Sequence, residues 1–311
     1  MKRIGIIIGI VFVLSALAYV LYKNNTFLNP EAGKVHVVAS FYPYAFFAEQ
    51  VGGEHVSVYS VTPVGVEPHD FEPSPRDLQR IESAQLFIYN GAGFDAWAEK
   101  AVTNGSEMNA SEYVHLLSLA DENEDIHEDD HDHEHSEYDP HFWLDTENAE
   151  KIVDQIELQL SSLDPDNSEV YAQNAQKIKQ QLGNINEDYL SSMQYCRQNE
   201  IVVSHNAYSY LGKKYGFTIH SIAGLSTDNE ASPQDLARLT QEVRSKNIKY
   251  ILFETLVSPQ VAQTLAKETN TKTLVLNPIE GLTQEDIQKG NNYYTIMKEN
   301  LSVLTTAREC N

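Results

Sequence analysis

Three histidines stand in segments suited to hold a bound ion. His69 lies in the segment Val-Glu-Pro-His-Asp-Phe-Glu-Pro, His141 lies in Asp-Pro-His-Phe-Trp-Leu-Asp, and His205 follows the run Ile-Val-Val-Ser. Imidazole nitrogen is a borderline ligand that suits zinc, and three such nitrogens supply most of a tetrahedral coordination shell. The sequence therefore predicts a metal site formed by His69, His141 and His205, provided that the fold brings these distant residues together.

Carboxylates lie beside two of the three histidines. Asp70 follows His69 directly, and Asp139 and Asp145 flank His141. A carboxylate that accepts a hydrogen bond from one ring nitrogen fixes the orientation of the imidazole and leaves the other nitrogen for the metal. We therefore expect some of these aspartates to orient the predicted ligands.

The elements that must position the histidines alternate along the chain. Apolar runs predict strands at residues 35–39, 56–61, 85–90, 200–204, 217–222, 249–253 and 273–276. Helical patterns cover residues 42–51, 75–84, 146–160, 166–195, 207–215, 232–246, 258–269 and 290–306. This alternation predicts βαβ units and parallel sheets, in which ligands bind beyond the carboxyl ends of the strands.

The predicted helix at residues 166–195 would reach about 45 Å, which is too long to pack on one small domain. We therefore predict an α/β protein with two similar lobes, at residues 31–145 and 197–311. Connecting helices at residues 146–196, which include the long helix, join them, and the metal site lies in the cleft between the lobes. The length of 311 residues also indicates about two domains.

Composition excludes several classes of function. The chain has 22 Lys and Arg against 45 Asp and Glu, a formal net charge of −23. Such an acidic chain is not expected to bind nucleic acid, whose phosphates require a basic surface, but it suits a cationic ligand. Its two cysteines, Cys196 and Cys310, exclude zinc-finger and iron–sulfur frameworks. Outside the cell they could form a disulfide, and two unpaired thiols are the alternative.

The amino-terminal segment predicts the compartment. Lys2 and Arg3 precede a nearly continuous apolar run at residues 4–22, which is long enough to cross a membrane as a helix. We favour an uncleaved anchor with the body outside the cytoplasm, and a cleaved signal peptide within residues 1–30 is the alternative. No cysteine lies near residue 20, so a lipid-modified cysteine is excluded.

Residues 121–138 form a low-complexity loop that cannot contribute to a core. Residues 121–139 hold eleven acids and no Lys or Arg. The loop also carries four histidines, His127, His131, His133 and His135. We expect a low-affinity zinc collector that feeds the cleft, and the alternative is a solvated linker that binds metal incidentally.

The three histidine segments resemble those of a known family. The segments around His69, His141 and His205, with the acidic histidine-rich loop before the second, are similar to those of the periplasmic metal-binding solute proteins of ABC importers. These proteins form the ZnuA-like and TroA-like group, also called cluster A-I. The resemblance runs from about residue 35 to the carboxyl end.

The resemblance implies two four-stranded α/β domains, a rigid backbone helix, and an interface metal that is passed to a permease driven by an ATPase. It favours zinc over manganese, because manganese-type members usually have Glu where this chain has His205. Family members commonly have Asp where this chain has Asn277. The fourth ligand could therefore be water, Asn277, or a carboxylate such as Glu254.

Two other functions compete with that of a monomeric zinc receptor. A zinc-dependent hydrolase would use a three-histidine site with water in the fourth position. None of the predicted helices contains the zinc-binding pattern His-Glu-x-x-His, and the sequence has no phosphate-binding Gly-x-x-x-x-Gly-Lys-Ser/Thr loop, so we expect no enzyme. A surface adhesin or passive metal buffer on the same fold is the second alternative.

Overall fold

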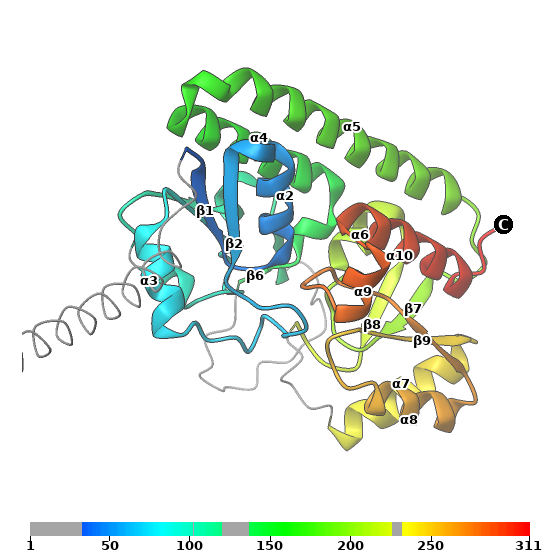
Figure 1. Ribbon diagram of the computed structural model, residues 1–311. Helices are drawn as coiled ribbons and strands as arrows, with labels where there is room; N and C mark the ends of the chain where they lie inside the picture. The colour runs from blue at the N-terminus through cyan, green and yellow to red at the C-terminus, as the bar shows by residue number, and fades with distance from the viewer. Residues whose placement is uncertain (1–32, 102, 120–136, 226–231) are drawn as a thin grey trace, which may run out of the picture.

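Two α/β lobes lie under one long helix in the computed structural model, which describes residues 33–101, 103–119, 137–225 and 232–311 (Figure 1). The N-terminal lobe has a four-stranded parallel sheet of order β2-β1-β3-β4. The C-terminal lobe has a second one, of order β10-β9-β7-β8. The predicted fold class, two parallel α/β lobes of four strands each, is therefore confirmed.

The N-terminal lobe follows the predicted alternation, with short additions. Its elements are β1 (Val35–Ala39), α2 (Tyr42–Gly52), β2 (Val56–Ser60), α3 (Pro75–Ser83), β3 (Leu86–Tyr89), β4 (Ser106–Asn109), β5 (Leu117–Ser118) and β6 (Tyr138–Asp139). Strand β4 was not expected, because only Met108 of its four residues is buried. It lies at the edge of the sheet, where one apolar contact to the core suffices. The antiparallel pair β5 and β6 was also not expected.

Helix α3 begins as the sequence predicts, and its start fixes the segment that carries His69. The side chain of Ser74 accepts a hydrogen bond from the backbone N–H of Asp77, and the Asp77 side chain accepts one from the backbone N–H of Ser74. This capping box satisfies N–H groups that the first helical turn leaves without partners. The chain between β2 and α3 is therefore held at its carboxyl end.

The long helix joins both lobes. It is α5 (Ser168–Ser192), 25 residues and thus about 38 Å long, and it packs beside α4 (Thr146–Leu163) above the lobes (Figure 1). Near its start, the Asn174 side chain donates to the carbonyl of Val51 in the N-terminal lobe, at 3.0 Å. Near its end, the Tyr189 hydroxyl donates to the carbonyl of Met297 in the C-terminal lobe, at 2.7 Å. The predicted role of this helix as a connection between lobes is confirmed.

The C-terminal lobe repeats the alternation. Its elements are β7 (Glu200–Val203), α6 (Ser209–Tyr215), β8 (Thr218–Ser221), α7 (Pro233–Ser245), β9 (Tyr250–Phe253), α8 (Gln260–Thr269), β10 (Lys272–Val275), α9 (Gln284–Lys289) and α10 (Tyr293–Ala307). Only the six-residue helix α9 was not expected.

One hydrophobic core runs through both lobes. It includes side chains of β1 and α2, of α4 and α5, and of β7 and α10. Trp143, which is fully buried in the N-terminal lobe, donates its indole N–H to the carbonyl of Pro278 in the C-terminal lobe, at 2.8 Å. The Tyr293 hydroxyl of α10 donates to the carbonyl of Trp143, at 2.6 Å. These contacts join the lobes across the interface as well as through the long helix.

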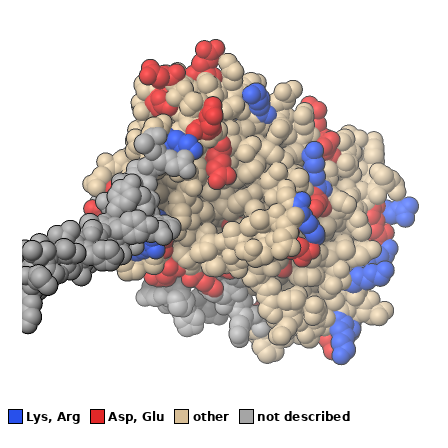
Figure 2. All heavy atoms as spheres, in the orientation of Figure 1, with Lys and Arg blue, Asp and Glu red and all other residues tan. Residues whose placement is uncertain are grey.

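Two predicted segments fall wholly or mostly outside the described residues. These are the apolar run at residues 4–22 and nearly all of the acidic loop. Within the ranges that the structure describes, no helix is both long and apolar enough to span a bilayer. Acidic side chains are scattered over both lobes on the face drawn in Figure 2, and most visible Lys and Arg lie over the C-terminal lobe.

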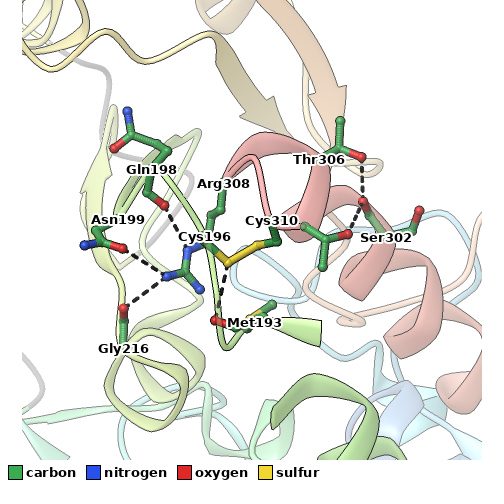
Figure 3. The surroundings of a disulfide bond; sticks show 10 residues. Met193, Cys196, Gln198, Asn199, Gly216, Ser302, Thr306, Arg308 and Cys310 are labelled. Atoms are coloured by element: carbon green, nitrogen blue, oxygen red, sulfur yellow. Dashed lines mark hydrogen bonds between the residues drawn. A yellow bond between two sulfur atoms is a disulfide. The ribbon is translucent and has the colours of Figure 1, made fainter. Parts of the chain in front are cut away.

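Cys196 and Cys310 form a disulfide, the first of the two alternatives that the sequence left open (Figure 3). The bond ties the segment between α5 and β7 to the carboxyl end of the chain, 114 residues away. The two segments also pair through their backbones, since the N–H of Gln198 donates to the carbonyl of Arg308 at 2.9 Å. The stretch of chain between the two cysteines therefore comprises nearly all of the C-terminal lobe.

Replacing both cysteines, in a Cys196→Ser/Cys310→Ser variant, is expected to lower the free energy of unfolding by about 3–5 kcal/mol. The reason is that a cross-link over such a long loop restricts the unfolded chain. Chemical denaturation of both proteins measures this difference. Thiol titration of the denatured wild type should find no free thiol before reduction and two after it, and two free thiols without reductant would contradict the bond.

Candidate metal centre

Four side chains meet between the two lobes. His69 lies in the segment between β2 and α3, and His141 follows β6, so both come from the N-terminal lobe. His205 follows β7, and Glu280 lies in the segment between β10 and α9, so both come from the C-terminal lobe. His205 and Glu280 thus follow strands of the parallel C-terminal sheet, at the edge where parallel sheets place ligands, whereas His141 follows a strand of the antiparallel pair.

Their donor atoms lie at the distances of a tetrahedral coordination shell. The Nε2 atom of His141 lies 3.3 Å from the Nε2 atoms of both His69 and His205. The Oε1 atom of Glu280 lies 3.4 Å from the Nε2 atoms of His69 and His205 and 3.5 Å from that of His141. These are five of the six edges of the tetrahedron, and the sixth is no longer than 4.8 Å. A regular tetrahedron with edges of about 3.4 Å has its centre about 2.1 Å from each corner, which is the usual zinc–nitrogen distance.

The group is almost closed to solvent. The side chains of His141 and His205 are fully buried, that of Glu280 is 1% exposed, and that of His69 is 7% exposed. Neither oxygen of Glu280 has a hydrogen-bond partner among the described residues. A buried carboxylate is costly unless a cation or hydrogen-bond donors face it. The donor set therefore fits a small cation at its centre.

Two further carboxylates orient the imidazoles. The Nδ1 atom of His141 lies 2.8 Å from Oδ1 of Asp139, and the Nδ1 atom of His205 lies 2.6 Å from Oε1 of Glu254. With Nδ1 engaged, each ring presents Nε2 to the centre of the group. The expectation for Asp139 thus fits the geometry. Asp145 instead caps α4, and Asp70 is exposed at the surface.

His69 is positioned differently from the other two histidines. Its ring packs against the ring of Phe94, with centroids 4.4 Å apart. Its backbone N–H donates to the carboxylate of Glu67, at 3.2 Å. The segment before it contacts the Glu280 segment, because the N–H of Gly65 donates to the carbonyl of Leu282 at 2.9 Å. His69 is therefore held in a loop that contacts the opposite lobe.

Glu280 supplies the fourth donor atom of the group, although no sequence motif pointed to it. Asn277 and Glu254, the residues expected as a fourth ligand, do not belong to the group of four. The Oδ1 atom of Asn277 accepts a hydrogen bond from the N–H of Ile279, at 2.8 Å. Glu254 accepts from the Ser204 hydroxyl and contacts the far side of the His205 ring. A carboxylate shortly after a predicted strand was the available signal.

The backbone before Glu280 is strained. Ile279 is fully buried and has a φ of 60°, a left-handed conformation that is an outlier for a β-branched residue. Such a conformation costs about 1–3 kcal/mol and persists only where the surroundings impose it. Here Asn277 supports the turn, and the Asn300 side chain in turn bonds the N–H and carbonyl of Asn277. Asn277 therefore helps to present Glu280.

The protonation of the four groups is coupled to their burial and to each other. Burial lowers the pKa of His69 below its usual value, with Glu280 opposing the shift. Burial also opposes protonation of the other two, but Asp139 raises the pKa of His141, and Glu254 with Glu280 raises the pKa of His205 well above its usual value. Against the effect of burial, the three imidazoles hold the pKa of Glu280 well below its usual range. The negative charge of Glu280 and protons on His141 and His205 therefore favour one another.

The four histidines of the acidic loop, His127, His131, His133 and His135, all lie outside the described residues. The group of four is complete without them.

Known proteins resemble this chain over nearly its whole length. The chain is 39% identical over 281 residues to the high-affinity zinc uptake system protein ZnuA of Bacillus subtilis, covering 89% of this chain and 88% of that protein. It is 35% identical to the zinc-binding lipoprotein AdcA of Streptococcus pneumoniae, covering 99% of this chain but 62% of AdcA. The chain therefore spans less than two thirds of the length of AdcA.

A solved structure and a family description agree with these relatives. The Zn(II)-bound ZnuA-like domain of Streptococcus pneumoniae AdcA is 33% identical, with a TM-score of 0.75 over 89% of this chain and all of that domain. Residues 37–307 match the family described as ZnuA, zinc-uptake complex component A, periplasmic. The chain therefore belongs to the ZnuA family of zinc-uptake proteins.

Proposed function

We propose that this protein is the zinc-binding receptor of an ABC importer and delivers its ion to a membrane permease that an ATPase drives. The observation that carries the proposal is the buried group of His69, His141, His205 and Glu280, in which five of the six donor–donor distances are 3.3–3.5 Å. Membership of the ZnuA family, and the zinc uptake for which its Bacillus subtilis relative is named, support it.

The donor types favour zinc over manganese. Three imidazole nitrogens and one carboxylate oxygen in a tetrahedral arrangement suit zinc, which has no need of higher coordination. Manganese prefers oxygen ligands and an octahedral shell, and four donors at these edges leave no room for two more. Zinc is therefore the ion that we assign to the site.

The geometry favours binding over catalysis. Catalytic zinc sites keep one position for water or substrate, whereas structural and binding sites are closed by four protein donors. Glu280 fills the fourth position that a hydrolase would need for water. The family description, which names zinc uptake, supports an importer component over an adhesin or a passive buffer.

The protein is proposed to lie outside the cytoplasm, which the description of the family as periplasmic supports. We assign residues 4–22 to a membrane anchor, and we divide the body into lobes at residues 31–145 and 197–311 with connecting helices at 146–196. The protein is proposed to act as a monomer, because the two lobes of a single chain supply all four side chains of the site.

The acidic loop is proposed to collect zinc for the cleft. Three of its four histidines, His131, His133 and His135, alternate with acids shortly before the segment that carries His141. Alternating imidazoles on an extended chain lie close enough to share an ion weakly, and eleven acids attract cations over about one Debye length. The loop would thus raise the local concentration of zinc beside the cleft.

Replacing His69 by Ala is expected to weaken zinc binding by at least about 100-fold, because losing only a group that orients a ligand costs 10–100-fold. Glu280→Gln should weaken it by more than about tenfold, since the amide keeps an oxygen but loses the charge. Competition titration against a zinc chelator measures both constants.

Two variants are controls for these substitutions. His115→Ala removes an exposed histidine, and Glu285→Gln removes an exposed carboxylate on α9. Both should bind zinc like the wild type. Unchanged affinity in Glu280→Gln would show that water or another residue completes the shell, and unchanged affinity in His69→Ala would contradict the whole site.

Zinc affinity is expected to fall as the pH is lowered, beginning above the ordinary histidine pKa of about 6.5. The raised pKa of His141 and of His205 means that these rings hold protons to higher pH, and zinc must displace them. Each displaced proton costs about tenfold in affinity per pH unit. Chelator competition between pH 5 and pH 8 measures the slope, and a constant affinity down to pH 4.5 would exclude the three-histidine shell.

Deleting residues 121–137 is expected to slow zinc capture at low zinc concentration and to remove weak additional binding, while the tight site keeps its affinity. Stopped-flow capture measures the rate, and equilibrium titration counts the sites. An unchanged rate of zinc capture would contradict the role of the loop as a zinc collector and would support the alternative, a solvated linker. Loss of the tight site would contradict the assignment of the loop as an auxiliary element.

A further inference from the structure

A buried arginine near the disulfide has no acidic partner among the residues that the structure describes. Arg308, at the carboxyl end of α10, is 2% exposed. Its guanidinium donates to the carbonyls of Gln198 and Gly216, at 3.3 and 3.1 Å, and to the side-chain oxygen of Asn199, at 3.5 Å (Figure 3). It also lies over the ring of Phe217, 4.8 Å from the centroid. All of these partners are neutral.

One nitrogen of this guanidinium is unsatisfied. Nη1 of Arg308 is buried and has no hydrogen-bond partner among the described residues. Arginine stays protonated in proteins, so the group is a buried positive charge. A buried charge without a counter-charge costs several kcal/mol, and a donor left without an acceptor adds to that cost. An anion at Nη1 would remove both penalties.

A surface pocket of about 540 Å³ lies against this arginine. Its walls come from the end of α5, the end of α6 and the segment that holds Cys196. In Figure 3 the unpaired nitrogen of Arg308 points toward the space between Gly216 and Met193, and both residues line the pocket. The pocket is large enough for a small polyatomic anion.

The other charged group of the pocket already has partners. The Nζ atom of Lys214 lies 2.6 Å from Oδ1 of Asp145 and 3.1 Å from Oε1 of Glu147. These carboxylates balance the lysine, whereas no carboxylate of the described residues faces Arg308. The uncompensated charge is therefore that of Arg308.

We propose that this pocket binds a small oxyanion, inorganic phosphate or a carboxylate, through the guanidinium of Arg308. The planar fork of N–H groups matches the oxygens of either anion. The bound anion would join the end of the long helix to the end of α10 and the turn after α6. The site is separate from the group of four, so the proposal does not depend on zinc binding.

Thermal unfolding in increasing sodium phosphate, with sodium chloride at matched ionic strength as reference, tests the proposal. The wild-type Tm should rise by about 2–4 °C for each tenfold increase in phosphate above its dissociation constant. Sodium acetate tests the carboxylate in the same way. A rise with either anion supports the site, and a rise with neither overturns it.

Asn199→Asp separates specific binding from general salt effects and keeps Arg308 in place. Asn199 is exposed, and the substitution puts a carboxylate beside Nη2 of Arg308, so the chain then supplies its own anion. This variant should unfold at a higher temperature than the wild type in anion-free buffer, and its rise with phosphate should disappear.

Asn247→Asp, which adds the same charge at an exposed position elsewhere in the C-terminal lobe, is the matched control. It should keep the wild-type rise with phosphate. An equal rise in the wild type and in Asn199→Asp would overturn the proposal, because the stabilisation would not involve Arg308.

Discussion

The structure depends on one constraint: four polar metal-donor side chains must lie close together in a space that is closed to water. Three imidazole nitrogens and one carboxylate oxygen lie within 4.8 Å of one another, five of the six distances are 3.3–3.5 Å, and the side chains are at most 7% exposed. Asp139 and Glu254 add two more buried carboxylates behind the rings. Such a cluster is unfavourable without a cation or bound protons, so the surrounding fold must hold it together.

The frame around the cluster is correspondingly rigid. One hydrophobic core passes through both lobes, and Trp143 is bonded to the opposite lobe through its indole N–H and its carbonyl. Helix α5 is bonded to each lobe, and the disulfide closes the end of the chain on the segment after that helix. Even the strained backbone at Ile279 is supported, since Asn277 and Asn300 hold the turn that presents Glu280. The two lobes are therefore joined at several points besides the site itself.

Elements with strong local patterns could be predicted from the sequence, and weakly patterned ones could not. Strands with continuous apolar runs, such as Ile201 to Val203, lie where expected because they are buried on both faces. Strand β4 was missed because only Met108 reaches the core, and α9 was missed because it spans only six residues. Glu280 was missed for a different reason. It lies in an irregular turn whose direction is set by Asn277, Asn300 and the opposite lobe.

The sequence by itself determined the α/β class, the two lobes, the long connecting helix and the three histidines, because periodicity and residue type are local properties. Tertiary structure decided that Glu280 completes the group, that Glu254 instead orients His205, and that Cys196 pairs with Cys310. It also left Arg308 buried beside a pocket, with no counter-charge from the described part of the chain. These outcomes depend on distances between atoms remote in the chain and on their removal from water, and no local pattern encodes either quantity.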